Sequence, residues 1–354
     1  MATLGYRAEI DAGQRFIEEI EPDETIALLF HGDADGCCSG AIMYRTLLGL
    51  GDDLVFPVFM AKNENLYSVS LADRVLAREP SRLIVMDMGS RTRAIVPGLT
   101  TLVIDHHRPE GIPPVDVFVS SFGVEPPAPA SLLTYQICKD FVQVGGLEWL
   151  AAMGVVGDLG FQADLEVVRN ARGLYTMKAI KEAVALVNAP RRAPAHDIPA
   201  AFGALIHADN PLDITEGAVP EIDALRKYRE EVNAEFARVV WTEPKFSGQW
   251  ALVKFSSPAL VHPMVAATWR RRLPESIVLA ANYGYTEGNV HFSVRSAKGV
   301  NLIDELRKIR PAEPGAEFAH GHPQATGGIL PLREFQDFLK SLGFPSDVAE
   351  SEPG

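Results

Sequence analysis

The feature that most constrains the fold is a regular alternation, in the first half of the chain, of apolar runs with helical patterns. The runs are TIALLFHGD, LVFPVFM, RLIVMD and TLVID, and helical periodicity fills 39–50 and 66–78 between them. Because apolar residues are nearly continuous in these runs, we expect strands that are covered on both faces, as in a parallel sheet. The rhythm predicts a β-α-β-α-β arrangement, and further helices are expected at 130–142 and 146–156.

The length of 354 residues predicts two domains, since single cores seldom grow beyond about 250–300 residues. Proline and alanine become frequent in 188–220, where we place the boundary. The expected α/β organisation is a parallel-sheet domain joined by a helical linker to a smaller domain with a mixed sheet. The acidic end after Phe344 is expected to fray. The boundaries are 1–190 for the first domain, 191–241 for the linker and connecting helix, 242–345 for the second domain and 346–354 for the tail.

Composition narrows the class of protein and of partner. No apolar stretch reaches the roughly 18 residues of a membrane span, and the start lacks the pattern of a secretory signal, so a cytoplasmic protein without membrane contact is expected. Three cysteines are too few for a disulfide framework or a thiolate zinc site. The net charge of −13 opposes binding of a long polyanion and favours a small substrate or a local basic groove.

Acidic side chains recur at or just beyond the ends of the apolar runs. In an open α/β sheet, ligands bind outside the carboxyl ends of the strands, so three parallel strands would deliver their acids to one place. Such anions repel one another unless cations neutralise them. A single acid of this kind is more often a turn residue or a helix cap, so the joint pattern carries the inference. The residues are Asp33, Asp35, Asp87, Asp105 with His106 and His107, and Asp158.

This set of donors predicts a site for divalent metal ions. Carboxylates with a minority of imidazoles suit Mg²⁺, Mn²⁺ or iron, and we favour Mn²⁺. Two such ions about 3.5–4 Å apart can activate water and polarise a phosphoryl group. A calcium-binding EF-hand is excluded, because the twelfth residue from Asp33 is Tyr44 and not the required Glu. A D-x-D phosphatase motif would leave the paired histidines unexplained.

Four segments in order, HGDADGCCSGAI, VMDMGS, VIDHH and GVVGD, resemble the motifs of the DHH phosphoesterase family. That family includes single-strand exonucleases of the RecJ type, oligoribonucleases, cyclic-dinucleotide phosphodiesterases and manganese pyrophosphatases. The resemblance implies a catalytic first domain in which Asp87 bridges two metal ions and His107 faces the substrate phosphate. The metal ligands that it implies are Asp33, Asp35, Asp87, His106 and Asp158.

One position departs from part of the family. The pyrophosphatase and oligoribonuclease branches carry a ligand histidine four residues before the first Asp, and that position is Leu29 here. His31 lies two residues before Asp33. The HGDADG segment is therefore more similar to the RecJ-like and archaeal exonuclease-like branch, and His31 is either a further metal ligand or a polar residue that lines the site.

The second half resembles the DHHA1 domain through HFSVRS and AHGHPQATGG. Glycines allow a phosphate or base to approach the backbone, and an arginine can pair bidentately with phosphate. Without the resemblance, the same segments would equally suit a turn-rich loop and a solvated strand arginine. A family glycine is replaced at Ala319 or His320. The substrate-binding residues that the resemblance implies are Arg295, Gly321, His322 and Gly327.

These observations favour a metal-dependent phosphoesterase that hydrolyses phosphodiester bonds in short oligonucleotides or dinucleotides. Two divalent ions are expected as cofactors, with Mn²⁺ preferred and Mg²⁺ as the second choice, and the substrate is expected to lie between the domains. The alternatives are a RecJ-type exonuclease for single-stranded DNA, a pyrophosphate, polyphosphate or phosphomonoester hydrolase, and a nucleotide-binding regulator without catalysis. The oligomeric state is left open, with a homodimer as one option.

Overall fold

The computed structural model describes residues 6–51, 54–125, 128–141, 146–297, 299–309, 318–351 and 353. The chain divides into two compact units. Unit 1 comprises Met1–Arg191 and His196–Tyr228, and unit 2 comprises Arg192–Ala195 and Arg229–Gly354.

Unit 1 is built on a five-stranded, all-parallel sheet in the order β2-β1-β3-β4-β5. This confirms the parallel sheet predicted from the continuous apolar runs. Every residue of β1 and β3 is buried, as expected of central strands with both faces covered. The strands are β1 (Ile26–Phe30), β2 (Val55–Val58), β3 (Arg82–Met86), β4 (Thr100–Asp105) and β5 (Val117–Ser120).

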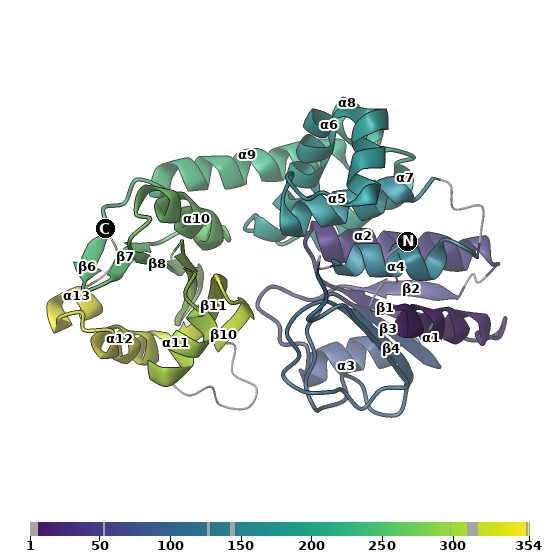
Figure 1. Cartoon of the computed structure of the whole chain (residues 1–354), viewed down its shortest axis with the longest axis horizontal. Helices are drawn as coiled ribbons and strands as arrows, with labels where there is room; N and C mark the ends of the chain where they lie inside the picture. The colour runs from purple at the N-terminus through teal and green to yellow at the C-terminus, as the bar shows by residue number, and fades with distance from the viewer. Residues whose placement is uncertain are drawn as a thin grey trace. The chain divides into compact units, whose positions relative to one another are not determined.

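Helices cover the two faces of this sheet and create two separate cores. In β1, Leu28 and Phe30 pack into the larger core, while Leu29 packs with Leu71 of α3 in the smaller one. Figure 1 shows α2, α4 and α5 on one side of the strands and α3 on the other. The helices are α1 (Arg7–Glu18), α2 (Ala34–Gly49), α3 (Val69–Leu76), α4 (Ala130–Cys138) and α5 (Glu148–Leu159).

The order of the strands defines where a ligand is expected. From β1 the chain first adds β2 on one side and then crosses back to add β3, β4 and β5 on the other. Such a reversal between β1 and β3 is the switch point at which open α/β sheets bind ligands, outside the carboxyl ends of the strands. The two strand ends are joined there by a hydrogen bond from His31 N to Met86 O of 3.2 Å.

The proline-rich segment 188–220 contains two helices that belong to unit 1. α7 (Ile198–His207) and α8 (Pro211–Glu216) each have a proline in the first turn, where its missing N–H costs nothing. Phe202 and Ile214 from these helices are buried in the larger core. The prolines therefore start helices here. Arg192–Ala195 belong to unit 2, and the chain returns to unit 1 at His196.

α6 (Glu166–Arg192) is interrupted at Thr176, which has φ 65° and ψ 146°. This region is almost confined to glycine and is strained for a β-branched residue. Thr176 Oγ1 accepts a hydrogen bond of 3.3 Å from Ala179 N, so its side chain caps the second half of the helix. The break sets the two halves of α6 in different directions.

We predict that Thr176→Gly stabilises unit 1. Relief of strain contributes about 1–3 kcal/mol, and from the middle of that range upward it exceeds the sum of roughly 0.5–1 kcal/mol of added backbone entropy and the few tenths lost at the cap. Urea unfolding followed by circular dichroism should give a higher midpoint. Thr215→Gly, at an ordinary helical position of α8, is the matched control and should lower the midpoint. A lower midpoint for Thr176→Gly as well would contradict the strain argument.

Unit 2 is built on a six-stranded mixed sheet in the order β10-β11-β9-β8-β7-β6, in which only β7 and β8 run parallel. This confirms the mixed sheet predicted for the second domain. The face that carries Phe292 and Val294 packs in the core of the unit. The strands are β6 (Lys245–Ser247), β7 (Trp250–Phe255), β8 (Ile277–Thr286), β9 (Asn289–Ser296), β10 (Phe318–His322) and β11 (Ala325–Pro331).

The remaining helices are α9 (Ile222–Val239), α10 (His262–Arg272), α11 (Leu302–Ile309), α12 (Leu332–Ser341) and α13 (Ser346–Glu350). α9 begins in unit 1 and ends in unit 2. α10 packs on β8 and β9.

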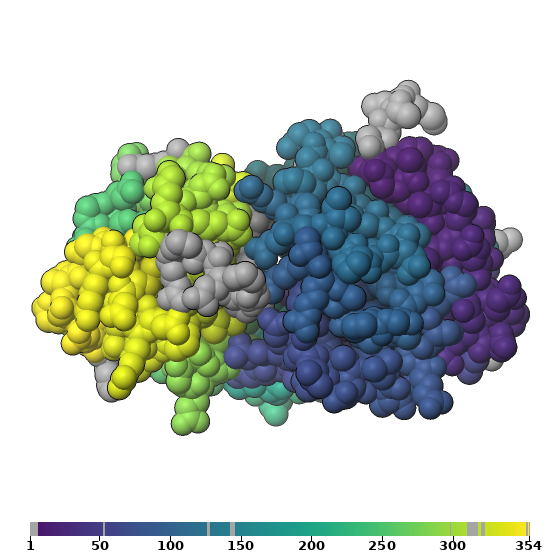
Figure 2. Space-filling view, turned by 90° about the horizontal axis from the view of Figure 1, so that it is seen from below, coloured from purple at the N-terminus to yellow at the C-terminus, as the bar shows by residue number. Residues whose placement is uncertain are grey.

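The expectation that the chain frays after Phe344 is wrong. α13 follows, Ala349 is fully buried, and Lys254 Nζ donates to Val348 O at 3.0 Å and to Ser351 O. Figure 2 shows the yellow C-terminal residues as a compact mass. A buried ammonium group needs acceptors, and the carbonyl groups at the end of α13 supply them, which local composition did not reveal.

Among the described residues, no helix combines the length and apolar character needed to cross a membrane.

Candidate metal centre

Three neighbouring strands of unit 1 end at the candidate centre. His31 and Asp33 follow β1, Asp87 follows β3, and His106 follows Asp105 at the end of β4. Because β1, β3 and β4 are adjacent and parallel, their carboxyl ends lie at the same edge of the sheet. Two further acids come from helices: Asp35 from the first turn of α2 and Asp158 from the last turn of α5.

Asp87 belongs to two groups of side chains that could hold a metal ion. In the first group, His31 Nδ1 lies 2.9 Å from Asp33 Oδ2 and 3.6 Å from Asp87 Oδ2. In the second, Asp87 Oδ1 lies 3.2 Å from His106 Nε2 and 3.7 Å from His107 Nδ1. The Asp87 carboxylate therefore stands between the two groups, with one oxygen turned to each.

His106 links the second group to the remaining acids. Its Nε2 lies 3.8 Å from Asp35 Oδ2, and its Nδ1 lies 3.8 Å from Asp158 Oδ2. The structure thus brings together all six residues of the first domain that the sequence predicted for the site, together with His31. The side chains of Asp87, His106 and Asp35 are almost fully buried, whereas those of Asp33 and His31 are about 30% exposed.

Asp105 is buried beneath the histidines and holds one of them. Its Oδ1 lies 2.9 Å from Nδ1 of His107 and also accepts a bond from the His107 backbone N–H. The ring of His107 is thereby fixed in rotation beside that of His106, with the ring centroids 4.4 Å apart. The sequence pattern placed Asp105 at the strand end but did not reveal this positioning role.

The backbone of Asp87 adopts the left-handed region, with φ 64°. Its N–H donates to Ile104 O of the neighbouring strand at 2.9 Å. Asp and Asn tolerate this conformation better than most residues. The chain leaves the sheet abruptly at the end of β3, which keeps the Asp87 side chain at the strand end.

Asp35 is held by the start of a different helix. Its two carboxylate oxygens accept hydrogen bonds from Ala130 N at 2.8 Å and Ser131 N at 3.0 Å, at the beginning of α4. The free N–H groups and the dipole of a helix N-terminus stabilise an anion. Gly154 of α5 leaves the room for this contact, since a Cβ there would lie 2.7 Å from Asp35 Oδ1.

The loop between β1 and α2 is fixed by close contacts of its own. Asp33 is the N-cap of α2 and accepts a bond of 3.2 Å from Gly36 N. A Cβ on Gly36 would lie 2.3 Å from His31 O, so only glycine fits there. Asn188 of α6 accepts a buried bond of 3.0 Å from Ala34 N. No sequence signal pointed to Asn188, because it comes from a distant helix.

Burial and mutual repulsion raise the pKa of two of the acids, whereas for Asp33 and Asp87 the neighbouring histidines outweigh burial and lower the pKa. Burial and the charge of Asp87 raise the pKa of Asp35 to about 8, and burial raises that of Asp158. Burial favours the neutral form of the histidines, but the neighbouring carboxylates prevail and raise the pKa of His31 to about 9 and that of His106 to about 10. Protons and a bound cation would therefore compete for the same atoms.

The donor set fits a divalent cation. Within the described part of the chain, the buried atoms Asp87 Oδ1, Asp105 Oδ2 and His31 Nδ1 have no hydrogen-bond partner of good geometry. Buried polar atoms are usually satisfied, and unsatisfied ones call for a water or an ion. Carboxylate oxygens in the majority with some imidazole nitrogens suit Mn²⁺ or Mg²⁺ better than structural zinc.

The residues predicted in the second half lie in unit 2. Arg295 of β9 is partly buried and donates to the carbonyl groups of Val294 at 3.0 Å and Thr326 at 3.2 Å. Gly327 of β11 is packed so closely on β9 that a Cβ would lie 2.4 Å from Phe292 O. Gly321 and His322 have backbones in β10, and the side chain of His322 lies outside the described residues.

No protein-family model and no curated protein matches the sequence. Solved structures do resemble it. RecJ of Thermus thermophilus in complex with Mn²⁺ matches with a TM-score of 0.71 and 16% identity, over 99% of this chain and 56% of that one. A RecJ exonuclease bound to manganese matches with a TM-score of 0.66 and 17% identity, over 99% of this chain and 98% of that one.

The DHH domain of a protein described as a member of a ribosomal protein family matches with a TM-score of 0.68 and 15% identity, over 98% of this chain and 92% of that one. The chain has the fold of the RecJ exonucleases. The RecJ fold thus accounts for both units, although the chain spans only about 56% of the Thermus thermophilus RecJ chain.

Gly154 gives a test of how the RecJ fold positions Asp35. In Gly154→Ala the new Cβ would lie 2.1 Å from Ser131 Oγ and 2.7 Å from Asp35 Oδ1. We predict a loss of Mn²⁺ affinity of about 10–100-fold, as for other residues that orient ligands. Isothermal titration with Mn²⁺ would measure it. Gly173→Ala, a helical glycine with open space around it, is the control, and equal affinities in the two variants would contradict the role of Gly154.

Proposed function

We propose that this chain is a metal-dependent phosphoesterase of the DHH/DHHA1 family, which hydrolyses phosphodiester bonds in short oligonucleotides or dinucleotides. The observation that carries the proposal is the place of Asp87, whose carboxylate belongs to both groups of donors. A carboxylate in that position could serve as a ligand to two cations, and pairs of metal ions are one arrangement that phosphoryl-transfer sites use. The likeness of fold to RecJ structures that contain manganese supports the same function.

The residues present would divide between two Mn²⁺ or Mg²⁺ ions. When bound, such ions polarise a phosphoryl group and make water more acidic. We assign His31 and Asp33 to one ion, Asp35, His106 and Asp158 to the other, and Asp87 to both.

The chain's own contribution is to hold these groups in place before substrate arrives. The N–H groups of α4 keep the Asp35 carboxylate from turning away from the centre. Asp105 fixes the ring of His107 through Nδ1, and we propose that the opposite edge of that ring contacts the substrate phosphate. Little motion of protein groups is then needed during the reaction.

In unit 2 we propose that Arg295 binds substrate phosphate, together with Gly321, His322 and Gly327. Burial and the neighbouring charge of Arg270 lower the pKa of Arg295 to about 10. In the described residues its hydrogen bonds go to two backbone carbonyl groups, so no carboxylate offsets the charge through these bonds. An anionic ligand would stabilise this guanidinium more strongly than a neutral one.

The acidic composition favours a short substrate. A net charge of −13 repels a long polyanion, and the repulsion grows with each added phosphate. Exonuclease activity on single-stranded DNA is the second candidate, favoured by the likeness to RecJ structures. A regulator that binds nucleotides without hydrolysis is the non-catalytic alternative.

A side-by-side assay tests these alternatives. Purified protein with Mn²⁺ would be offered a dinucleotide, a five-residue RNA, long single-stranded DNA, a cyclic dinucleotide and pyrophosphate. We predict that initial rates are highest for the dinucleotide and the short RNA. Higher rates on long DNA would favour the exonuclease, hydrolysis of pyrophosphate alone would contradict the proposal, and binding without hydrolysis would favour the regulator.

Removal of the shared carboxylate tests the metal centre directly. We predict that Mn²⁺ raises the melting temperature of the wild type, because a ligand at about 100 times its Kd stabilises the folded state by about 2.7 kcal/mol. Asp87→Asn keeps a side chain that tolerates positive φ, but it loses one anionic charge shared by both groups. The variant should lose most of the Mn²⁺-dependent shift in differential scanning calorimetry and all measurable hydrolysis.

Asp73→Asn, on the exposed surface of α3, is the matched control and should behave as the wild type in both measurements. An unchanged Mn²⁺ shift in Asp87→Asn, or unchanged hydrolysis, would overturn the assignment of Asp87 as the shared ligand.

A further inference from the structure

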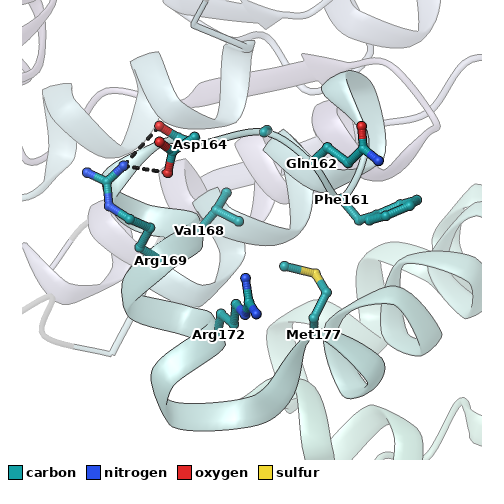
Figure 3. Close-up of a pocket in the computed structure, with 8 residues that line it drawn as sticks. Phe161, Gln162, Asp164, Val168, Arg169, Arg172 and Met177 are labelled. Atoms are coloured by element: carbon teal, nitrogen blue, oxygen red, sulfur yellow. Dashed lines mark hydrogen bonds and ion pairs between the residues drawn. The ribbon is translucent and has the colours of Figure 1, made fainter.

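A pocket of about 510 Å³ lies in unit 1, beyond the end of α5. It is formed by the loop between α5 and α6, by the first half of α6 and by the residue that follows the break at Thr176 (Figure 3). Its volume lies within the range of small-ligand sites. We call it the Phe161 pocket, and its lining residues are Phe161, Gln162, Ala163, Asp164, Val168, Arg169, Arg172 and Met177.

The pocket begins on the segment that carries a candidate metal ligand. Asp158 stands in the last turn of α5, the helix ends at Gly160 with φ 84°, and Phe161 is the next residue. Three residues of chain reach at most about 11 Å. The edge of the pocket formed by Phe161 is therefore within reach of a nucleotide joined to a phosphate at the metal centre.

One part of the lining is apolar. Phe161 is 52% exposed although it is a large aromatic residue, and Val168 and Met177 line the same space. Lys181 Nζ lies 3.4 Å from the centroid of the Phe161 ring, so a cation covers one face of it. A flat aromatic ligand could pack against this wall, since stacking on aromatic side chains is how proteins bind nucleobases without sequence preference.

The charged part of the lining is positive overall. Asp164 is the only carboxylate among the lining residues, and it is paired with Arg169 at 2.8 Å, as the dashed lines of Figure 3 show. Arg172, on the other side of the lining, is not part of that pair. A net positive pocket in a chain with net charge −13 favours a ligand that carries an anionic group.

The strained break at Thr176 places an apolar and a positively charged residue of the lining beside each other. Arg172 precedes the break by four residues and Met177 follows it directly, and Figure 3 shows their side chains at the same side of the pocket. A continuous helix would carry the chain onward without this change of direction. Backbone strain of this kind persists only where the surrounding structure enforces it.

We propose that the Phe161 pocket binds the nucleotide adjoining the one whose phosphate lies at the metal centre. The base packs against Phe161, Val168 and Met177, and its phosphate pairs with Arg172. This inference rests on the proposed function and names a subsite for it. Inorganic phosphate alone would make no contact with the apolar part of the lining, and an uncharged aromatic ligand would give Arg172 no anionic partner.

Binding to metal-free protein separates the subsite from the metal centre. Isothermal titration with adenosine monophosphate in EDTA prevents turnover, and the acidic centre without cations repels the phosphate. We expect adenosine monophosphate to bind the wild type. Inorganic phosphate should bind at least about fivefold more weakly, the minimum that one base stack contributes, and adenosine roughly tenfold more weakly, because it lacks the anionic group that pairs with Arg172. Equal affinity for inorganic phosphate would reduce the pocket to a simple anion site and overturn the proposal.

Variants locate this binding in the pocket. Phe161→Ala should weaken adenosine monophosphate binding by about fivefold or more, and Arg172→Ala should weaken it by roughly tenfold. Phe161→Tyr and Arg172→Lys should retain most of the binding. Arg15→Ala, an exposed arginine of α1, is the matched control. Thermal unfolding of each variant excludes global destabilisation as the cause. Wild-type affinity in both alanine variants would overturn the proposal.

Kinetics with Mn²⁺ distinguish a failure of the subsite from a failure of the proposed function. We expect both alanine variants to raise KM for a 5′-phosphorylated dinucleotide several-fold with little change in kcat. If the wild type hydrolyses the dinucleotide and neither variant changes KM or binding, the subsite is wrong and the function stands. If no phosphodiester is hydrolysed while binding depends on Phe161 and Arg172, the proposed function and the subsite role both fail, and a nucleotide-binding site remains.

Discussion

The gathering of mutually repelling carboxylates at one edge of a parallel sheet is the constraint on which the rest of the structure depends. Two of these acids are stabilised by helix ends: Asp33 caps α2, and Asp35 accepts two N–H groups at the start of α4. Each helix N-terminus provides about half a positive charge. Asp87 has no such support among its described contacts, and the imidazoles of His31 and His106 beside it stabilise its charge instead.

Three local departures from ordinary geometry lie beside these same acids. Asp87 has positive φ, Gly154 leaves space that a methyl group would take from Asp35, and Gly36 lies against the carbonyl group of His31. Each departure would destabilise an isolated segment, and the packing of α2, α4 and α5 on the sheet offsets it. Conflicts between local preference and overall fold are frequent at functional sites, and these three agree with a binding role for the centre.

Much of this centre could be predicted from sequence because parallel strands fix where their ends meet. The apolar runs located β1, β3 and β4, and adjacency in the sheet then placed Asp33, Asp87 and His106 together. Because side chains alternate between the two faces of β1, Leu29 packs in the core on the α3 side of the sheet and does not face the metal centre. His31 lies beyond the strand end and can turn toward Asp33. Asn188, the role of Asp105, the break at Thr176 and α13 depend on contacts distant in sequence, which no local pattern records.

The distribution of charge says more about the ligands that the chain can bind than its net charge does. The total of −13 describes the average surface, yet a dense cluster of acids in unit 1 lies a short stretch of chain from a pocket whose lining is positive. A cation at the first and an anion at the second are complementary, since a phosphate bound to metal and a neighbouring phosphate bound to Arg172 would belong to one substrate. Selection for a short nucleotide would then come from the spacing of two oppositely charged sites along α5 and α6, in addition to the repulsion of a long polyanion by the overall charge.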